Sequence, residues 1–262
     1  MKTNGNTIFI SGGGSGIGRE LARAFHRLGN KVIIAGRRAQ ALDETALDYP
    51  GISKYVVDVR DPLSIGHLVA TMLSEHPDLN VLVNNAGIMR KEDLAGQAPD
   101  GNDAEEAVET NLLGPIRLTN ALLPHLRQQV ASTVINVTSG LAFVPLVATP
   151  TYCATKAALH SYTISLRQQL RNTAIEVIEL IPPGVQTDLM PGHAVNPVMM
   201  PLKAFIDEVM ALFVQQPTPE EICVKRVELQ RYAEAQGRFD SVLKILNSPT
   251  AAIGSPQHAV AP

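Results

Sequence analysis

A short apolar strand that runs directly into a glycine-rich turn is the feature that most constrains the fold of this chain. Residues 7–10 (Thr-Ile-Phe-Ile) are typical of a buried parallel strand, and residues 11–18 (Ser-Gly-Gly-Gly-Ser-Gly-Ile-Gly) follow at once. An amphipathic helical pattern then runs to Gly29-Asn30. Strand, turn and helix form the first half of a βαβ unit, so we expect a doubly wound α/β fold with a mainly parallel sheet and helices on both faces.

The glycine-rich turn is suited to a phosphate-bearing ligand. Glycines let the backbone approach a pyrophosphate, whose charge meets free N–H groups and the positive end of the helix dipole. The same residues could form a tight turn with no ligand. The position of the turn, between a strand and a helix at the start of the chain, favours dinucleotide binding.

The end of the second predicted strand indicates which dinucleotide. Cofactors without a 2′-phosphate usually need a carboxylate here to hold the ribose hydroxyls, and Gly36 has none. Arg37 and Arg38 follow, and their guanidinium groups suit a phosphate dianion and stacking on adenine. The sequence therefore predicts NADP(H) rather than NAD(H). The alternative is that both arginines are solvated residues at the start of a helix.

Alternating strand and helix patterns continue along the chain. A helix is predicted from Ser64 to Glu75 after an Asp61-Pro62 start, and a long helix at 103–129 with a kink at Gly114-Pro115. Another helix is predicted with Thr218 as N-cap. We expect one Rossmann-type domain over 1–247 and a disordered tail over 248–262. Further strands are predicted at 53–57, 81–83, 133–137 and 176–180.

Tyr152 and Lys156 are candidates for proton transfer. Residues four apart share one face of a helix, so the phenol and the ammonium can converge. A neighbouring cation favours phenolate and would lower the pKa of the tyrosine from its usual ~10. The pair alone is weak, because a solvated or packed Tyr–Lys pair at this spacing is common.

Composition excludes several classes of function. The net charge of −3 gives no electrostatic grip on nucleic acid or anionic lipid. The two cysteines cannot form a disulfide framework, and no Cys/His cluster has the spacing of metal ligands. With no signal-peptide pattern and no apolar run near the ~18 residues that span a bilayer, we expect a cytoplasmic protein.

Several motifs together resemble the short-chain dehydrogenase/reductase family over residues 6–190. The family's order and spacing are matched, and the Gly36-Arg37 strand end and C-terminal segment are similar to a poorly characterised branch associated with the D-alanyl-lipoteichoic-acid operon. The motifs are Ser11-Gly12-x-x-x-Gly16-Ile17-Gly18, Asn84-Asn85-Ala86-Gly87, Asn111, Ser139 and Tyr152-x-x-x-Lys156.

The resemblance implies a catalytic role for each of four residues. Tyr152 would be the acid/base that exchanges a proton with the carbonyl or alcohol oxygen, and Ser139 would hydrogen-bond that oxygen. Lys156 would bind the nicotinamide ribose and lower the pKa of Tyr152. Asn111 would hold a water that connects Lys156 to solvent.

The resemblance also implies the cofactor contacts. Proline at 183, where the family usually has glycine, removes a backbone donor and stiffens the turn after the sixth strand. The implied contacts are Ser11, Gly12, Ser15, Gly16, Ile17 and Gly18 at the phosphates, Arg37 and Arg38 at the 2′-phosphate, Asp58 and Val59 at the adenine, Asn85, Ala86 and Gly87 near the ribose, Tyr152 and Lys156, and Pro182, Val185 and Thr187 at the carboxamide.

These observations predict an NADPH-dependent oxidoreductase that interconverts a carbonyl and an alcohol on a small or medium, apolar substrate. The alternative is a non-catalytic dinucleotide-binding sensor or scaffold. Residues 188–216 are rich in Met and Pro and are expected to form a substrate lid, although they could equally be the core-packing residues of one helix. By analogy with the family we expect a homodimer or homotetramer.

Overall fold

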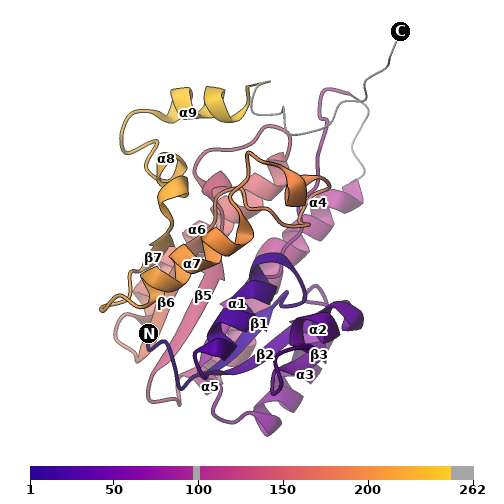
Figure 1. The fold of residues 1–262 in the computed structure, drawn as a ribbon, viewed down its shortest axis with the longest axis vertical. Helices are drawn as coiled ribbons and strands as arrows, with labels where there is room; N and C mark the ends of the chain where they lie inside the picture. The colour runs from indigo at the N-terminus through magenta and orange to yellow at the C-terminus, as the bar shows by residue number, and fades with distance from the viewer. Residues whose placement is uncertain (97–100, 249–262) are drawn as a thin grey trace.

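A parallel sheet of seven strands runs through the described part of the chain (Figure 1). The computed structural model describes residues 1–96 and 101–248. The strand order is β3-β2-β1-β4-β5-β6-β7, so the direction of winding reverses between β1 and β4. The strands are β1 (Thr7–Ser11), β2 (Lys31–Gly36), β3 (Ser53–Val56), β4 (Val81–Asn84), β5 (Ser132–Val137), β6 (Ile175–Ile181) and β7 (Glu221–Cys223).

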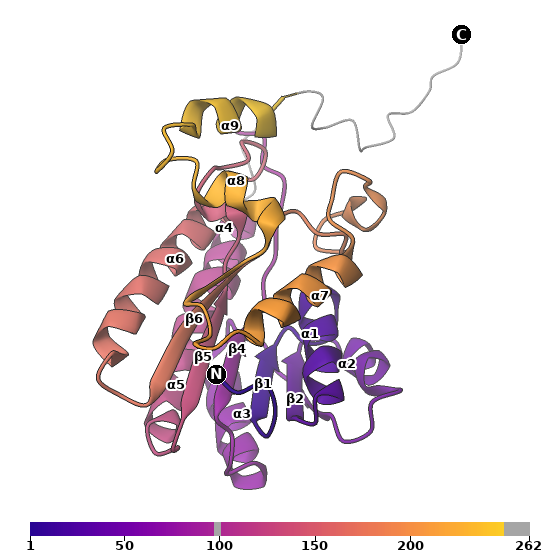
Figure 2. The same ribbon diagram turned by 60° about the vertical axis from the view of Figure 1, so that its left-hand side comes forward.

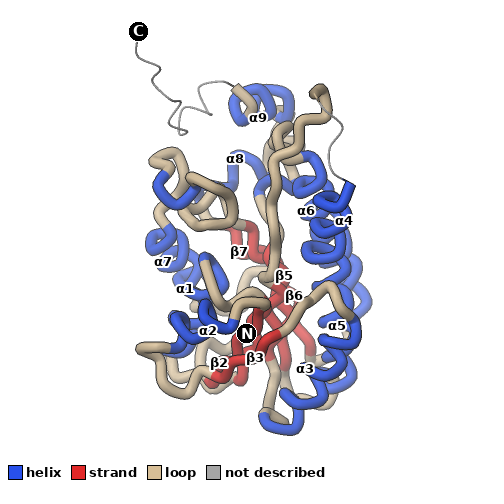
Figure 3. The backbone as a smooth tube through the Cα atoms, turned by 90° about the vertical axis from the view of Figure 1, so that its right-hand side faces the viewer, coloured by secondary structure: helices blue, strands red, loops and turns tan. Residues whose placement is uncertain are grey.

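Helices cover both faces of this sheet, as Figure 3 shows edge-on. Both the fold class and the parallel pairing predicted from the sequence are confirmed. One layer contains α1 (Gly16–Arg27), α2 (Ala39–Ala46) and α7 (Leu202–Phe213), and the other contains α3 (Pro62–Glu75), α4 (Gly101–Val108), α5 (Gly114–Leu126) and α6 (Pro150–Leu170).

Two apolar cores form because successive strand side chains point to opposite faces. Ile8 and Ile10 of β1 pack in the core under α1 and α7, whereas Phe9 packs under α3 and α5. The rings of Phe25 and Phe213 meet in the first core at 5.7 Å between centroids. A strand buried on both faces has to be apolar throughout, which is why β1 reads as a continuous apolar run.

The start of α3 follows its local sequence. Asp61 is the N-cap and its carboxylate accepts a hydrogen bond from Leu63 N at 2.9 Å, with Pro62 at the first helical position. Proline has no N–H, and the first helical turn needs none there.

The long helix predicted over 103–129 is interrupted differently from the prediction. A π-helical turn, Glu109–Leu113, separates α4 from α5, and Gly114 N bonds to Glu109 O five residues back. The interruption expected at Gly114-Pro115 thus takes the form of a widened turn just before these residues. Pro115 has no N–H, so a carbonyl in the preceding turn lacks an intrahelical donor.

The prediction of a helix that starts at Thr218 is wrong. Residues Glu221–Cys223 form β7, which pairs with β6 in the register Glu179↔Glu221. Thr218 instead accepts a hydrogen bond from the Met1 ammonium at 2.6 Å. Pairing with the free edge of β6 satisfies a row of backbone groups, and this outweighs the local helical pattern.

The C-terminal helices α8 (Glu228–Arg231) and α9 (Phe239–Leu246) lie beyond the carboxyl end of the sheet (Figure 2). Val242 of α9 packs with Val144, a residue of the loop that follows β5. Across the described residues, no helix combines the length and apolarity needed to cross a bilayer. Disorder was predicted for residues 248–262, and residues 249–262 lie outside the described part of the chain.

Candidate active site

The glycine-rich turn leaves β1 at its carboxyl end, next to the point where the strand order reverses. Gly12 and Gly16 have φ values of 68° and 52°, which side chains other than glycine rarely adopt. Ser15 is the N-cap of α1 and makes no side-chain cap bond. The N–H groups of the first turn of α1 are therefore available to an anion.

Asn85 holds this turn in place. Its side-chain amide donates to Ser11 O at 3.0 Å and to Gly12 O at 3.1 Å. In return, Ser11 Oγ accepts from the backbone N–H groups of Asn85 and Ala86 at 3.1 and 3.2 Å. A Cβ at Gly18 would lie 2.3 Å from Asn85 Nδ2, so only glycine fits there. Both amide hydrogens of Asn85 are engaged, and Oδ1 is the side-chain atom left for the ribose predicted at this residue.

The end of β2 presents two unpaired cations. Arg37 and Arg38 are exposed, and neither guanidinium forms a hydrogen bond or ion pair with any residue that the structure describes. Asp58 lies nearby and is bound by Arg60, with an Nη2–Oδ2 distance of 2.8 Å. The hydrogen bond from Arg60 lowers the pKa of Asp58, and Arg37 adds a smaller Coulombic contribution in the same direction. Val59 is buried against Gly114, which brings the π-helical turn beside the predicted adenine position.

Asn111 is fully buried in the π-helical turn and uses all of its side-chain hydrogen-bonding groups. Oδ1 accepts from Ile88 N at 2.8 Å, and Nδ2 donates to Ile88 O at 2.9 Å and to Thr155 Oγ1 at 3.1 Å. Its side chain thus ties the segment after β4 to α6. A water held here would have to bind a backbone carbonyl of the turn.

Tyr152 and Lys156 converge inside the molecule, as their spacing on a helix predicts. Both are buried, at 7% and 4% exposure, and Lys156 Nζ lies 5.7 Å from the centroid of the Tyr152 ring. The ammonium donates to Val137 O at 2.8 Å. Glu92 caps the first turn of α6, where its carboxylate accepts from the N–H and the hydroxyl of Thr151 at 3.0 and 2.7 Å.

The electrostatics of this pair differ from the prediction. Burial raises the pKa of Tyr152 to about 12, and an opposing interaction with Ser139 offsets only part of this. Burial also lowers the pKa of Lys156 to about 8. The predicted lowering of the pKa of Tyr152 is therefore wrong for the ligand-free protein. The ammonium is engaged by the Val137 carbonyl, and desolvation of the phenol outweighs its influence.

Ser139 sits at the end of β5 beside this pair. Its Oγ accepts from Leu141 N at 3.1 Å and caps a short 3₁₀ turn, Gly140–Ala142. The Ser139 hydroxyl also interacts with the Tyr152 phenol, and its hydrogen can donate either to the phenol or to a ligand.

An apolar cluster of side chains packs against the Tyr152 ring. Met89 and Met190 are buried against it, with Leu141 and Leu146 packed alongside. Met89, Leu141 and Leu146 were not among the site residues predicted from the sequence. Met89 lies two residues after Gly87, Leu141 lies two residues after Ser139, and Leu146 lies in the loop that follows; these positions could have indicated them.

The predicted lid divides into two parts with different roles. In α7, Phe205, Val209 and Phe213 belong to the sheet core, so core packing is the correct interpretation of that helix. Met190, before α7, packs with Tyr152 and Met89 instead.

The turn after β6 approaches both the glycine-rich turn and the Ser139 loop. Pro182 O accepts from Gly140 N at 2.9 Å. Thr187 lies against the glycine-rich turn, because a Cβ at Gly16 would be 3.3 Å from Thr187 Cγ2. Val185 bridges to Met200, and Pro183 leaves this path intact because the adjacent Gly184 O accepts from Met200 N at 2.8 Å.

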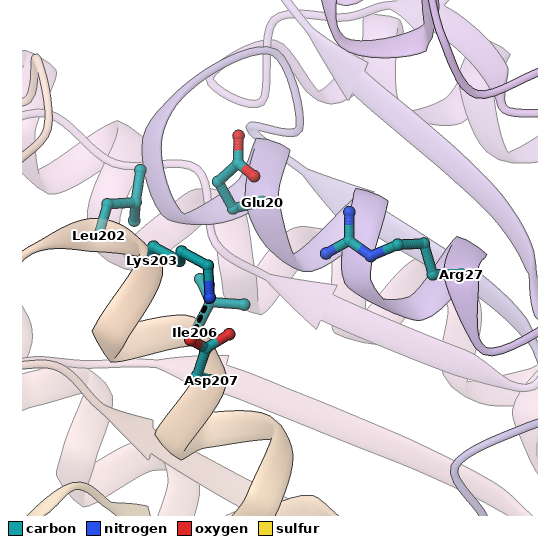
Figure 4. A pocket seen from close by; sticks show the side chains of 6 residues that line it. All are labelled: Glu20, Arg27, Leu202, Lys203, Ile206 and Asp207. Atoms are coloured by element: carbon teal, nitrogen blue, oxygen red, sulfur yellow. Dashed lines mark hydrogen bonds and ion pairs between the residues drawn. The ribbon is translucent and has the colours of Figure 1, made fainter.

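A separate groove of about 630 Å³ lies between α1 and α7 (Figure 4). Lys203 and Asp207 form an ion pair in it at 2.6 Å. Its lining includes none of the predicted site residues, so it is not part of this site. The lining residues are Glu20, Arg27, Leu202, Lys203, Ile206 and Asp207.

Three features thus lie at the carboxyl end of the sheet: a glycine-rich turn after the first strand, a buried Tyr–Lys pair and a serine at the end of β5. The family model for short chain dehydrogenases matches residues 6–194. The chain belongs to this family.

Two relatives and one solved structure are similar to this short chain dehydrogenase. It is 46% identical over 189 residues to the uncharacterized oxidoreductase DltE of Bacillus subtilis, covering 72% of this chain and 75% of that protein. This confirms the narrower resemblance seen in the sequence. It is 34% identical to an NADP-dependent 3-hydroxy acid dehydrogenase of Schizosaccharomyces pombe, over 71% of this chain and 74% of that one. The structure of a 3-ketoacyl-(acyl-carrier-protein) reductase from Brucella melitensis, complexed with NADH, matches with a TM-score of 0.75 at 25% identity, over 84% of this chain and 96% of that one.

Replacing Lys156 with methionine should stabilise the ligand-free dehydrogenase at pH 7. A buried ammonium is costly, and the lowered pKa corresponds to about 1–3 kcal/mol. Unfolded lysine keeps its proton up to about pH 10.5, whereas folded Lys156 releases it near pH 8. The wild type therefore gains stability between these pH values, and its deficit relative to Lys156→Met should shrink.

Urea unfolding at pH 7 and pH 9.5 measures both effects. Lys244→Met, at an exposed lysine of α9, is the control and should show no such pH-dependent difference from the wild type. An equal difference between Lys156→Met and the wild type at both pH values would contradict the assignment of a buried, charged Lys156.

Proposed function

We propose that this protein is an NADPH-dependent oxidoreductase that reduces a ketone or aldehyde to an alcohol, or catalyses the reverse, with Tyr152 as the acid/base. The observation that supports this best is the burial of the Tyr152 phenol beside both Ser139 and the apolar side chains of Met89 and Met190. With its pKa raised to about 12, the phenol holds its proton at neutral pH and can donate it to a carbonyl oxygen.

Each neighbouring residue has a part in that step. The hydroxyl of Ser139 would donate to the substrate oxygen and hold it near the phenol while negative charge develops. Lys156, released from Val137 O, would bind ribose hydroxyls and bring positive charge toward Tyr152. The π-helical turn at Asn111 would offer a carbonyl to a water that returns a proton to Lys156.

The residues present fit a nicotinamide dinucleotide. A Cβ at Gly12 or Gly18 would overlap residues 85–86, one at Gly16 would crowd Thr187, and the N-terminus of α1 is uncapped. When bound, the cofactor supplies the hydride, and this chain supplies orientation and proton transfer. Asp58 and Val59 would contact the adenine, and Pro182, Val185 and Thr187 would hold the carboxamide.

The preference for NADP(H) rests on the end of β2. Gly36 offers no carboxylate for a 2′-hydroxyl, and the unpaired Arg37 and Arg38 suit a 2′-phosphate. The substrate is expected to be apolar, because carbon and sulfur atoms surround the Tyr152 ring. By family analogy we propose a homodimer or homotetramer.

A non-catalytic dinucleotide sensor is the second candidate. It would use the same glycine-rich turn and arginines but would have no need of a buried phenol and ammonium. The burial of both Tyr152 and Lys156 favours an enzyme, because each is held in an environment that is unfavourable to its charged form.

Replacing Tyr152 with phenylalanine tests catalysis directly. Loss of the proton donor should reduce kcat/KM by about 10²–10⁴ while NADPH binding is retained. NADPH oxidation at 340 nm with a panel of ketones, aldehydes and diketones measures the effect. Tyr162→Phe, on the same helix, is the matched control and should stay within about twofold of the wild type. Equal activity of Tyr152→Phe and the wild type would refute the assigned acid/base.

Replacing Arg37 with alanine tests cofactor choice. Loss of a guanidinium–phosphate contact of about 1.5–3 kcal/mol should weaken NADPH binding about 10- to 100-fold and change NADH binding little. Fluorescence titration of each cofactor measures both constants. Arg171→Ala, at the exposed C-terminus of α6, should change neither. Equal losses for NADPH and NADH on Arg37→Ala would remove the argument for a 2′-phosphate site.

A further inference from the structure

A carboxylate that the proposed reaction does not use is buried close to Ser139. Glu179 of β6 has 0% exposure. Thr138 Oγ1 donates to its Oε1 at 2.7 Å, and His160 Nδ1 lies 2.8 Å from Oε2 and 3.0 Å from Oε1. Both carboxylate oxygens therefore have partners from elements distant in the sequence.

These partners belong to the two elements that bear the proposed catalytic residues. Thr138 immediately precedes Ser139 at the end of β5. His160 lies one helical turn after Lys156 on α6. The register Asn136↔Glu179 puts Glu179 and Thr138 on the same face of the sheet, the face that α6 covers. The carboxylate therefore links the strand end below Ser139 to the helix that carries Tyr152.

A second polar contact joins the same two elements. Lys156 Nζ donates to Val137 O at 2.8 Å, so α6 is attached to the end of β5 at two neighbouring helical turns. If Lys156 turns toward a ribose, the contact through Glu179 remains, together with a hydrogen bond from Asn136 Nδ2 to Thr163 Oγ1 at 2.9 Å farther along the helix.

Aromatic and charged side chains close this cluster from outside. Phe143 packs edge-on against the His160 ring at 4.7 Å between centroids. The Arg231 guanidinium lies over Phe143 at 4.7 Å and pairs with Glu221 at 2.7 Å. Because these groups exclude water, the carboxylate depends on Thr138 and His160 for its hydrogen bonds.

Stability alone does not account for a buried pair of this kind. Desolvation of a buried carboxylate costs several kcal/mol, and apolar residues of similar size often stabilise a core as well or better. The pair of Glu179 and His160 adds hydrogen bonds that have a defined direction and length. Proton transfer requires the donor and the acceptor to be held in position to well within about 1 Å. A fixed geometry therefore matters most beside the reacting groups.

We propose that Glu179 is a positioning residue that fixes Ser139 relative to Tyr152 through Thr138 and His160. This inference rests on the proposed carbonyl reduction for its effect on rate. Its effect on the Ser139 loop can be measured independently of any reaction.

The kinetic test uses Glu179→Gln in the full-length protein. With the glutamine oxygen facing Thr138, an NH₂ group replaces the carboxylate oxygen that lies 2.8 Å from His160 Nδ1, and the negative charge is lost. We expect kcat to fall about 10- to 100-fold, with KM for the carbonyl substrate and the NADPH dissociation constant within about twofold of the wild type. Glu176→Gln, near the opposite end of β6, is the matched control and should retain wild-type kcat.

A second pair of variants keeps the test independent of any folding defect in Glu179→Gln. Thr138→Val removes the hydroxyl and should lower kcat in the same way, and Thr138→Ser should restore it. Wild-type kcat in either Glu179→Gln or Thr138→Val would overturn the proposal.

Hydrogen exchange read by mass spectrometry gives the measurement that does not depend on turnover. Amides of residues 138–146 should exchange at least about tenfold faster in Glu179→Gln and Thr138→Val, with β1 and β2 unchanged. Unchanged exchange at 138–146, or faster exchange spread evenly over the chain, would overturn a positioning role. If the wild type reduces no carbonyl in the panel, the proposed function fails, and the exchange data still decide whether Glu179 positions the Ser139 loop.

Discussion

The attachment of α6 to the sheet is the constraint on which the proposed site depends. Polar contacts to the sheet are distributed along the helix, at Lys156 with Val137 O, at His160 with Glu179, at Thr163 with Asn136 and at Arg167 with Val177 O. Outside the sheet, Thr151 and Thr155 bond to Glu92 and Asn111. Apolar packing brings helix and sheet together without setting a rotation or translation, whereas hydrogen bonds of this kind set both.

This arrangement has an energetic cost at the place where chemistry is proposed. Tyr152 and Lys156 are both buried in surroundings that oppose their ionisation, in opposite pKa directions. An apolar pair at these positions would pack at lower cost. Two titratable groups held at such displaced pKa values beside apolar side chains are typical of a site for proton transfer.

Much of the fold could be predicted because the information was local. The apolar run of β1, the glycines after it and the Asp61-Pro62 helix start each act within a few residues, and the motif spacings fixed the family. The misses have non-local causes. Thr218 was expected to cap a helix, but the residues that follow it pair with the free edge of β6 and form β7. For the Met-rich segment the sequence left both a lid and core packing open, and only the structure shows that α7 enters the core while Met190 packs with Tyr152.

The candidate site divides in the same way. The sequence by itself determined which chemical groups are present and that Tyr152 and Lys156 share a helix face, since the helical repeat fixes that relation. Only the tertiary structure decided their ionisation, because burial depends on every element packed around them and moved the pKa of Tyr152 upward instead of down. It also decided that a glutamate of β6, which the sequence presents as one residue of an ordinary strand, lies beneath Ser139: parallel pairing with β5 and the cover of α6 bring it there, and no pattern along the chain records that meeting.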